Sequence, residues 1–174
     1  ALTETGTSLF GCDPSLFIEA VDMISQVDFP FSRAHSTGIQ WNGFKDSIPP
    51  PQGYIRKLLN EWEANGHLEK DKNSIDNTIN QIASGIEKLN SFIDQAQKGI
   101  ELLQFWSKAA QFQLKQASIA QHILGNNKTK EILQTLHTLK KEYEEFLQFD
   151  QTPESAAKNA GLVYDCLIEY IENN

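Results

Sequence analysis

The chain has 174 residues and a net charge of −8, from 15 Lys and Arg side chains against 23 Asp and Glu. This length suits one domain with a real hydrophobic core, and residues 1–174 are predicted to form a single helical domain. The acidic balance, with Arg33 and Arg56 as the only arginines, argues against a nucleic-acid partner, whose binding needs clustered cations.

No apolar run approaches the roughly 18 residues of a membrane-spanning helix. We therefore expect a soluble protein, cytoplasmic or secreted, without a membrane as its partner. Cys12 and Cys166 lie near opposite ends of the chain, and two alternatives stay open for them: two unpaired thiols, or a disulfide in an oxidising compartment.

The N-terminal third contains one clear helix and one long connection. Residues 1–12 have no period and are predicted to be a loose lead-in. Residues 13–29 are predicted to be a helix, with Asp13 as N-cap, Pro14 at the first position and an apolar face. That face consists of Leu16 or Phe17, Ala20, Val21, Ile24 and Val27.

Residues 30–50 are predicted to be an irregular loop, and loops of this length are uncommon in compact domains unless they bind something or are disordered. Trp41 and Phe44 in this loop either pin it to the bundle or act as anchors for a partner, because aromatic anchors dominate interface energetics. A second helix is predicted over 51–65, before the stop signal at Asn65 and Gly66.

A stripe of apolar residues predicts one long helix over residues 74–124, with coiled-coil-like heptads. The stripe continues in phase through Gly99, so an unbroken helix is expected there. Its a positions are Ile79, Ile86, Ile93, Ile100, Ser107 and Leu114, and its d positions are Ile75, Ile82, Leu89, Ala96, Leu103, Ala110 and Ala117.

The two halves of this stretch differ in width. Up to Gln97 the apolar stripe is narrow and resembles a seam for one partner helix. From Leu102 a second stripe joins it, which predicts burial between two or more neighbours; it contains Leu102, Phe105, Ala109, Phe112, Ile119 and Ile123.

Two further helices are predicted, over 128–149 and 153–172. The first has Ile132, Leu136, Leu139, Tyr143 and Phe146 on one face. The second begins with Thr152 as cap and Pro153 at its first position. No segment alternates with a period of two, so the predicted fold is all-α: a helical bundle of about five helices built around one amphipathic helix of about 50 residues.

The sequence contains no pattern that would support catalysis, a metal or a cofactor. The four histidines, His35, His67, His122 and His137, have no metal-ligand spacing. The stretch from Gly125 to Thr129 lacks the upstream glycine of a phosphate-binding loop. We therefore predict a protein that is not an enzyme, with no catalytic residues, no metal and no cofactor.

The function predicted from these features is a non-enzymatic helical protein–protein interaction or assembly module. A protein partner or a second copy would dock on the 75–100 seam through Ile75, Ile79, Ile82, Ile86, Leu89 and Ile93, with Trp41 and Phe44 as further candidates. The alternative for the seam is that the N-terminal helices cover it within the monomer. Two other functions are a secreted effector or toxin component with a membrane-active amphipathic helix, and a ligand-binding bundle.

Overall fold

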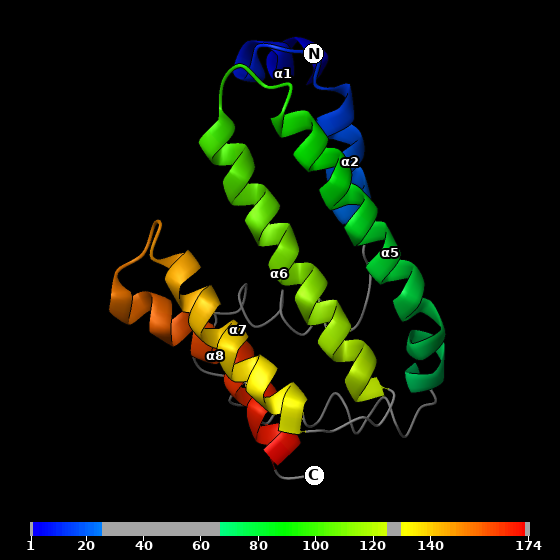
Figure 1. The fold of residues 1–174 in the computed structure, drawn as a ribbon, viewed down its shortest axis with the longest axis vertical. Helices are drawn as coiled ribbons and strands as arrows, with labels where there is room; N and C mark the ends of the chain where they lie inside the picture. Colours follow the sequence, from blue (N-terminus) through cyan, green and yellow to red (C-terminus); the bar gives the residue numbers. More distant parts are fainter. Residues whose placement is uncertain (1, 26–66, 125–129, 173–174) are drawn as a thin grey trace, which may run out of the picture. The chain divides into compact units, whose positions relative to one another are not determined.

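A computed structural model describes residues 2–25, 67–124 and 130–172, and every regular element in them is an α-helix (Figure 1). The predicted all-α class is thus confirmed for this part of the chain. The loop predicted over 30–50, with Trp41 and Phe44, and the helix predicted over 51–65 lie outside the described residues.

The chain forms two compact units. Unit 1 consists of residues 1–29 and 75–118, and unit 2 of residues 30–74 and 119–174. Unit 1 contains α1 (Leu2–Phe10), α2 (Ser15–Ser25) and most of α5 (His67–Ile93) and α6 (Ile100–Leu124), whereas unit 2 contains α7 (Lys130–Leu147) and α8 (Pro153–Glu172). That the two units act together as a single domain stays a prediction.

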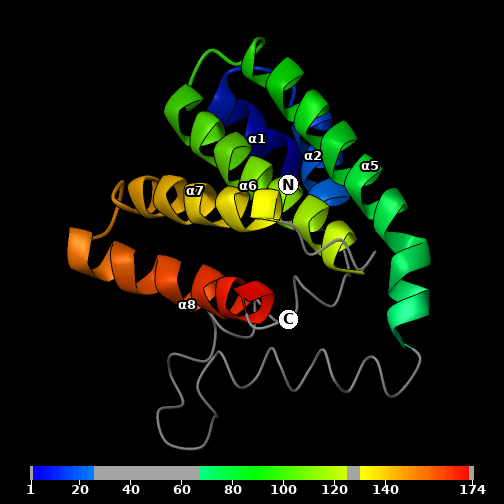
Figure 2. The same ribbon diagram turned by 60° about the horizontal axis from the view of Figure 1, so that its bottom comes forward.

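The prediction of one unbroken helix over 74–124 is wrong. α5 ends at Ile93, α6 begins at Ile100, and the two run antiparallel as a hairpin (Figures 1 and 2). Gly99 has φ +68°, a left-handed conformation that glycine adopts without steric cost. The apolar stripe keeps its phase because each helix of the hairpin turns a core face toward the other, and Ile93 and Ile100 happen to be seven residues apart.

The reversal between α5 and α6 depends on the N-terminus of the chain. The backbone N–H groups of Gln97 and Lys98 both donate to the carbonyl of Phe10, at 2.8 and 3.1 Å. Phe10 is the last residue of α1, so residues 1–12 are not the loose lead-in that the sequence predicts. A helix end supplies the acceptor that the turn needs, because backbone donors left without a partner are costly.

Unit 1 has a core of aromatic and small side chains where α1, α2, α5 and α6 meet. The buried members of this core cluster are Phe10, Ala20, Leu89, Phe92 and Leu103. The ring of Phe10 meets that of Phe92 edge to face, with centroids 5.3 Å apart, a favourable aromatic geometry. These residues come from all four helices, so the cluster joins the N-terminal segment to the hairpin.

Helix α2 begins where its sequence predicts, and one side of it packs closely on α5. The Asp13 carboxylate accepts a hydrogen bond from the Ser15 N–H, which caps the helix start. Farther along, a Cβ on Gly85 of α5 would lie 2.7 Å from Cγ1 of Ile24 and 3.2 Å from the Ala20 carbonyl oxygen. The two helices therefore approach closely at a pair of small residues, Ala20 and Gly85.

Unit 2 contains an antiparallel hairpin of α7 and α8, side by side in both views (Figures 1 and 2). The Thr152 hydroxyl accepts from the Ser155 N–H and caps α8, as predicted. Leu136 and Leu139 are buried on α7, as their spacing predicts. The Tyr143 ring meets that of buried Tyr164 edge to face at 5.7 Å, and burial raises the pKa of its hydroxyl from the ordinary 10.0.

Replacing Gly85 by Ala should lower the free energy of unfolding by about 1 kcal/mol, since overpacking costs about 1–3 kcal/mol and better helix propensity returns about 1. Gly161→Ala in α8 is the matched control, because the nearest atom there is the end of the Asp165 carboxylate, a side chain that can move. It should raise stability by up to about 1 kcal/mol. Urea unfolding measures both variants; equal effects would contradict close packing of α2 on α5.

The raised pKa of Tyr143 predicts a loss of stability in alkali. The folded state resists ionisation of this hydroxyl, so its contribution is complete below pH 10.0 and falls as the pH rises toward the raised pKa. Tyr143→Phe should therefore lose stability less steeply than the wild type above pH 10.0. Urea unfolding at a series of pH values tests this, and parallel curves for the two proteins would contradict it.

Candidate functional site

The residues predicted to form a docking seam on α5 are largely enclosed by the chain itself. Ile75, Ile82, Ile86 and Leu89 are buried, and Ile79 and Ile93 are half-buried. Trp41 and Phe44, the other predicted anchors, lie outside the described residues.

Helices α2 and α6 cover the seam toward the hairpin turn. Leu89 belongs to the core cluster with Ala20 of α2 and Leu103 of α6. The Gln81 side-chain amide donates to the Met23 carbonyl at 2.9 Å, which adds a polar tie between α5 and α2. Buried side chains offer little surface to a partner, so binding at the seam stays a prediction.

An exposed apolar surface runs along α2 and the start of α6. We name it the α2–α6 strip; it consists of Phe17, Ile18 and Val21 of α2 and Leu102 and Trp106 of α6. The exposed fractions of Ile18, Val21, Leu102 and Trp106 are 39, 40, 48 and 38%. Contiguous exposed apolar surface is uncommon on soluble proteins and often marks a binding site, whereas single exposed apolar residues are normal.

The rings of Phe17 and Trp106 make the strip continuous across the two helices. They stack with centroids 5.3 Å apart and planes 20° apart. Val21 follows Phe17 by one helical turn, and Leu102 precedes Trp106 by one turn, so each lies on the same face as its ring. The strip therefore has two apolar edges joined by an aromatic contact.

The strip is also anchored to the core of unit 1. Phe17 is half-buried, and its ring lies 5.6 Å from Phe92 and 5.0 Å from Phe10. Trp106 thus rests on a ring that is itself packed against buried aromatic residues. An indole ring that is already restricted by stacking loses little conformational entropy when a partner binds. This favours Trp106 as an interface anchor.

The other large apolar residues with high exposure are Leu9, Ile100 and Phe149 among the described residues. Leu9 and Ile100 flank the contact between α1 and the hairpin turn, where the Leu9 carbonyl oxygen lies near Gly99. Phe149 follows α7 in unit 2. The α2–α6 strip is defined by the Phe17–Trp106 stack and the residues one turn from it, and these three residues are not part of it.

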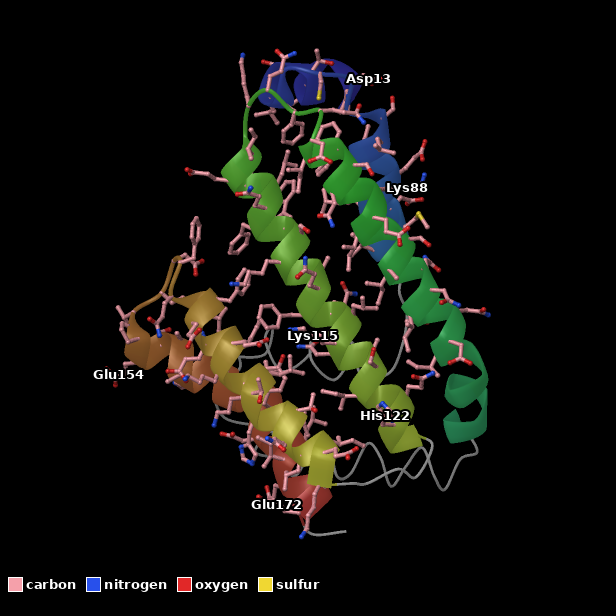
Figure 3. All side chains as sticks on the ribbon, in the orientation of Figure 1. Asp13, Lys88, Lys115, His122, Glu154 and Glu172 are labelled. Carbon is pink, nitrogen blue, oxygen red and sulfur yellow. The ribbon has the colours of Figure 1, made fainter. Side chains whose placement is uncertain are left out.

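An acidic side chain borders the α2 edge of the strip. Asp22 is exposed and lies one helical turn after Ile18, whereas exposed Glu19 lies about 100° farther round the helix than Ile18, and Asp13 stands before the first residue of α2 (Figure 3). Lys88 of α5 pairs with Glu19 at 2.8 Å. An exposed pair of this kind contributes about 0.2–1 kcal/mol, so it locates α2 on α5 only weakly.

The described residues offer few groups for chemistry. No three or more His, Cys, Asp or Glu side chains gather there in a way that could hold a metal ion. Cys12 is a free, half-buried thiol that packs against the core cluster. Within the described helices, none is both long enough and apolar enough to cross a bilayer.

The sequence analysis did not predict the strip, because it assigned some of its members to buried helix faces and left the others without a predicted role. Val21 was expected on the buried face of α2, and Leu102 in the buried second stripe of α6, yet both are exposed. Phe112 and Ile119 of that stripe are buried, as predicted. The available signals were Ile18, which lies off the predicted core face, and Trp106, an aromatic at a g position.

Comparisons of the chain with protein-family models, curated proteins and solved structures give no match. A functional assignment must therefore come from the residues of this chain.

Substitutions in the strip should separate binding from folding. Val21→Ser and Leu102→Ser, at exposed positions, should each change the free energy of unfolding by about 1 kcal/mol or less. Phe92→Ala, in the core cluster, should cost about 3–5 kcal/mol because it removes a fully buried ring. Urea unfolding measures all three, and a cost at Val21 equal to that at Phe92 would show that the strip is core.

Proposed function

We propose that this chain is a non-enzymatic helical protein–protein interaction module that docks a protein partner on the α2–α6 strip. The carrying observation is the exposure of Ile18, Val21, Leu102 and Trp106 on two adjoining helices that the Phe17–Trp106 stack joins. Exposing four large apolar side chains to water in one continuous surface is unfavourable. A partner that buries them would gain the corresponding free energy.

Two features of the strip support docking rather than a packing defect. Its indole is held by a ring that reaches the core, so the binding geometry exists before the partner arrives. Exposed Asp22 lies one helical turn after Ile18 at the α2 edge of the strip, and a polar group at the edge of an apolar surface matches the usual pattern of an apolar interface core with a polar rim.

The other functions that the sequence suggests, a membrane-active helix and a ligand-binding bundle, stay predictions. The strip gives docking a defined set of residues, whereas neither alternative gains a comparable set among the described residues. Assembly of identical copies is one form of the proposed function, and the experiment below distinguishes it.

A photo-crosslinking amino acid at position 21 should form covalent adducts with the partner in the cells that make this protein. The adducts should disappear when Leu102→Ser is added, because that change weakens the strip without touching the crosslinking position. Denaturing gels and mass spectrometry of the adducts measure the result. Light scattering of the purified chain over a dilution series shows whether the partner is a second copy.

The matched control places the same amino acid at position 104, because Gln104 is exposed on α6 and lies outside the strip. Adducts of the same protein in equal amount from positions 21 and 104 would contradict docking on the strip. So would adducts from position 21 that persist in the Leu102→Ser variant, provided that variant unfolds at the wild-type urea concentration.

A further inference from the structure

The turn between α5 and α6 interrupts helical hydrogen bonding only briefly. The Ala96 N–H still donates to the Phe92 carbonyl at 3.0 Å, and the Gly99 carbonyl already accepts from the Leu103 N–H at 3.0 Å. Residues 94–99 read DQAQKG, which contains no proline, and its Gln, Ala and Lys are good helix formers. The local sequence therefore permits a continuous helix, and a contact from elsewhere in the chain holds the turn.

That contact takes up two backbone donors that a continuous helix would use. In such a helix the N–H groups of Gln97 and Lys98 would donate to the carbonyls four residues earlier, those of Ile93 and Asp94. In the hairpin both N–H groups donate to the carbonyl of Phe10 at the end of α1. Release of α1 would free two donors for which a continuous helix has acceptors in place.

Helix α1 has a small attachment to the rest of unit 1. Among residues 5–10 only Gly6 and Phe10 are buried, and a helix of nine residues is too short to persist alone. Gly11 has φ +74°, and a Cβ there would lie 2.9 Å from Cβ of Gln97. The docking of α1 on the turn thus depends on Phe10 and on a close approach at Gly11.

We propose that α1 holds α5 and α6 in the hairpin, and that its release lets them join into one continuous helix that pairs antiparallel with the same helix of a second copy. In this dimer α5 of each chain packs on α6 of the other, so both core faces keep the contacts of the hairpin. Exchange of identical elements is a low-cost route to a dimer. The inference does not depend on the α2–α6 strip.

The phase of the apolar stripe supports the continuous helix. Ile93 and Ile100 are seven residues apart across the turn, as are Ala96 and Leu103. A hairpin does not need this spacing, because its turn can set the rotation of α6 independently of α5. A continuous helix needs it, since the apolar residues of both halves must lie on one side to contact one partner helix. The spacing that the hairpin leaves to chance is therefore a requirement of the dimer.

A polar pair favours a second copy as the partner helix. The buried Ser107 hydroxyl donates to the side-chain carbonyl of Asn90 at 2.7 Å. On one continuous helix these residues would stand about 26 Å apart, so the bond could not form within the chain. In the antiparallel dimer Asn90 of each chain meets Ser107 of the other, whereas an unrelated helix would have to supply its own acceptor for a buried hydroxyl.

The first test measures the mass of the full chain by light scattering over a dilution series. Gly11→Ala should detach α1, because its Cβ clashes with Gln97 at a left-handed φ. Gly99→Ala should favour the continuous helix, because alanine disfavours φ +68° and favours a helix. Each variant should raise the dimerisation constant at least about a hundredfold, since one dimer contains two turns. Gly161→Ala in α8 is the matched control and should leave the mass unchanged.

A proline at position 100 should reverse the effect. Proline is tolerated at the first position of α6 and is strongly unfavourable inside a continuous helix. Ile100→Pro added to Gly11→Ala should therefore return the mass to that of a monomer. Wild type refolded from urea at high protein concentration should contain a dimer fraction that Ile100→Pro lacks, and this comparison decides where neither glycine variant folds.

A disulfide shows which chains pair. The chain would carry Asn90→Cys and Ser107→Cys, with Cys12→Ala and Cys166→Ala to remove the native thiols. In the hairpin, oxidation joins the two new cysteines within one chain, whereas in the exchanged dimer it joins two chains. Non-reducing denaturing gels should show mainly monomer for this protein and mainly covalent dimer once Gly11→Ala is added.

Three outcomes would overturn the proposal. The first is a folded Gly11→Ala or Gly99→Ala protein that stays monomeric at every concentration. The second is a dimer whose cysteines join within one chain, because association would then occur on another surface. The third, where neither glycine variant folds, is a refolded wild type without the dimer fraction. The proposed docking function is decided separately, since Leu102→Ser weakens the strip and should leave the exchanged dimer intact.

Discussion

The contact between the end of α1 and the hairpin turn is the constraint on which unit 1 depends. The Phe10 carbonyl accepts two backbone N–H groups of the turn, and the Phe10 ring packs against Phe92 in the core cluster. A Cβ on Gly99 would meet that ring at 3.2 Å, so the turn fits only with glycine at its left-handed position. Phe10 thus ties the end of α1 to the turn between α5 and α6 through its carbonyl, and to α2 and α5 through its ring.

Local signals predicted the helices well where the chain itself decides their ends. Asp13 and Thr152 cap α2 and α8, and the spacing of Leu136 and Leu139 gives the buried face of α7. The hairpin could not be predicted in the same way. A single apolar stripe along one straight helix and two facing apolar stripes on the helices of a hairpin produce the same heptad spacing in the sequence. A carbonyl more than eighty residues away in the chain decides between them, and no local pattern contains it.

The candidate site was harder to predict than the fold, since periodicity gives the direction of a helical face and not the element that covers it. Val21 and Leu102 belong to apolar faces by spacing and are exposed because α2 and α6 meet through Phe17 and Trp106 instead. Conversely, the regular isoleucines of α5 suggested a surface for a partner and are mostly buried. The regularity of a stripe therefore indicated burial here, and the irregular apolar residues mark the exposed surface.

The exposure of the strip follows from how α2 packs. Seven of its eleven residues are apolar, Leu16, Phe17, Ile18, Ala20, Val21, Met23 and Ile24, and they cover more of the helix than one hairpin can bury. Close approach at Ala20 and Gly85 turns that side of α2 toward α5, and Ile18 and Val21 stay exposed outside this contact. The contacts that hold α2 include Phe17, Ala20 and Ile24, and polar residues at 18 and 21 would leave these contacts in place. The apolar side chains there are therefore explained by binding better than by folding.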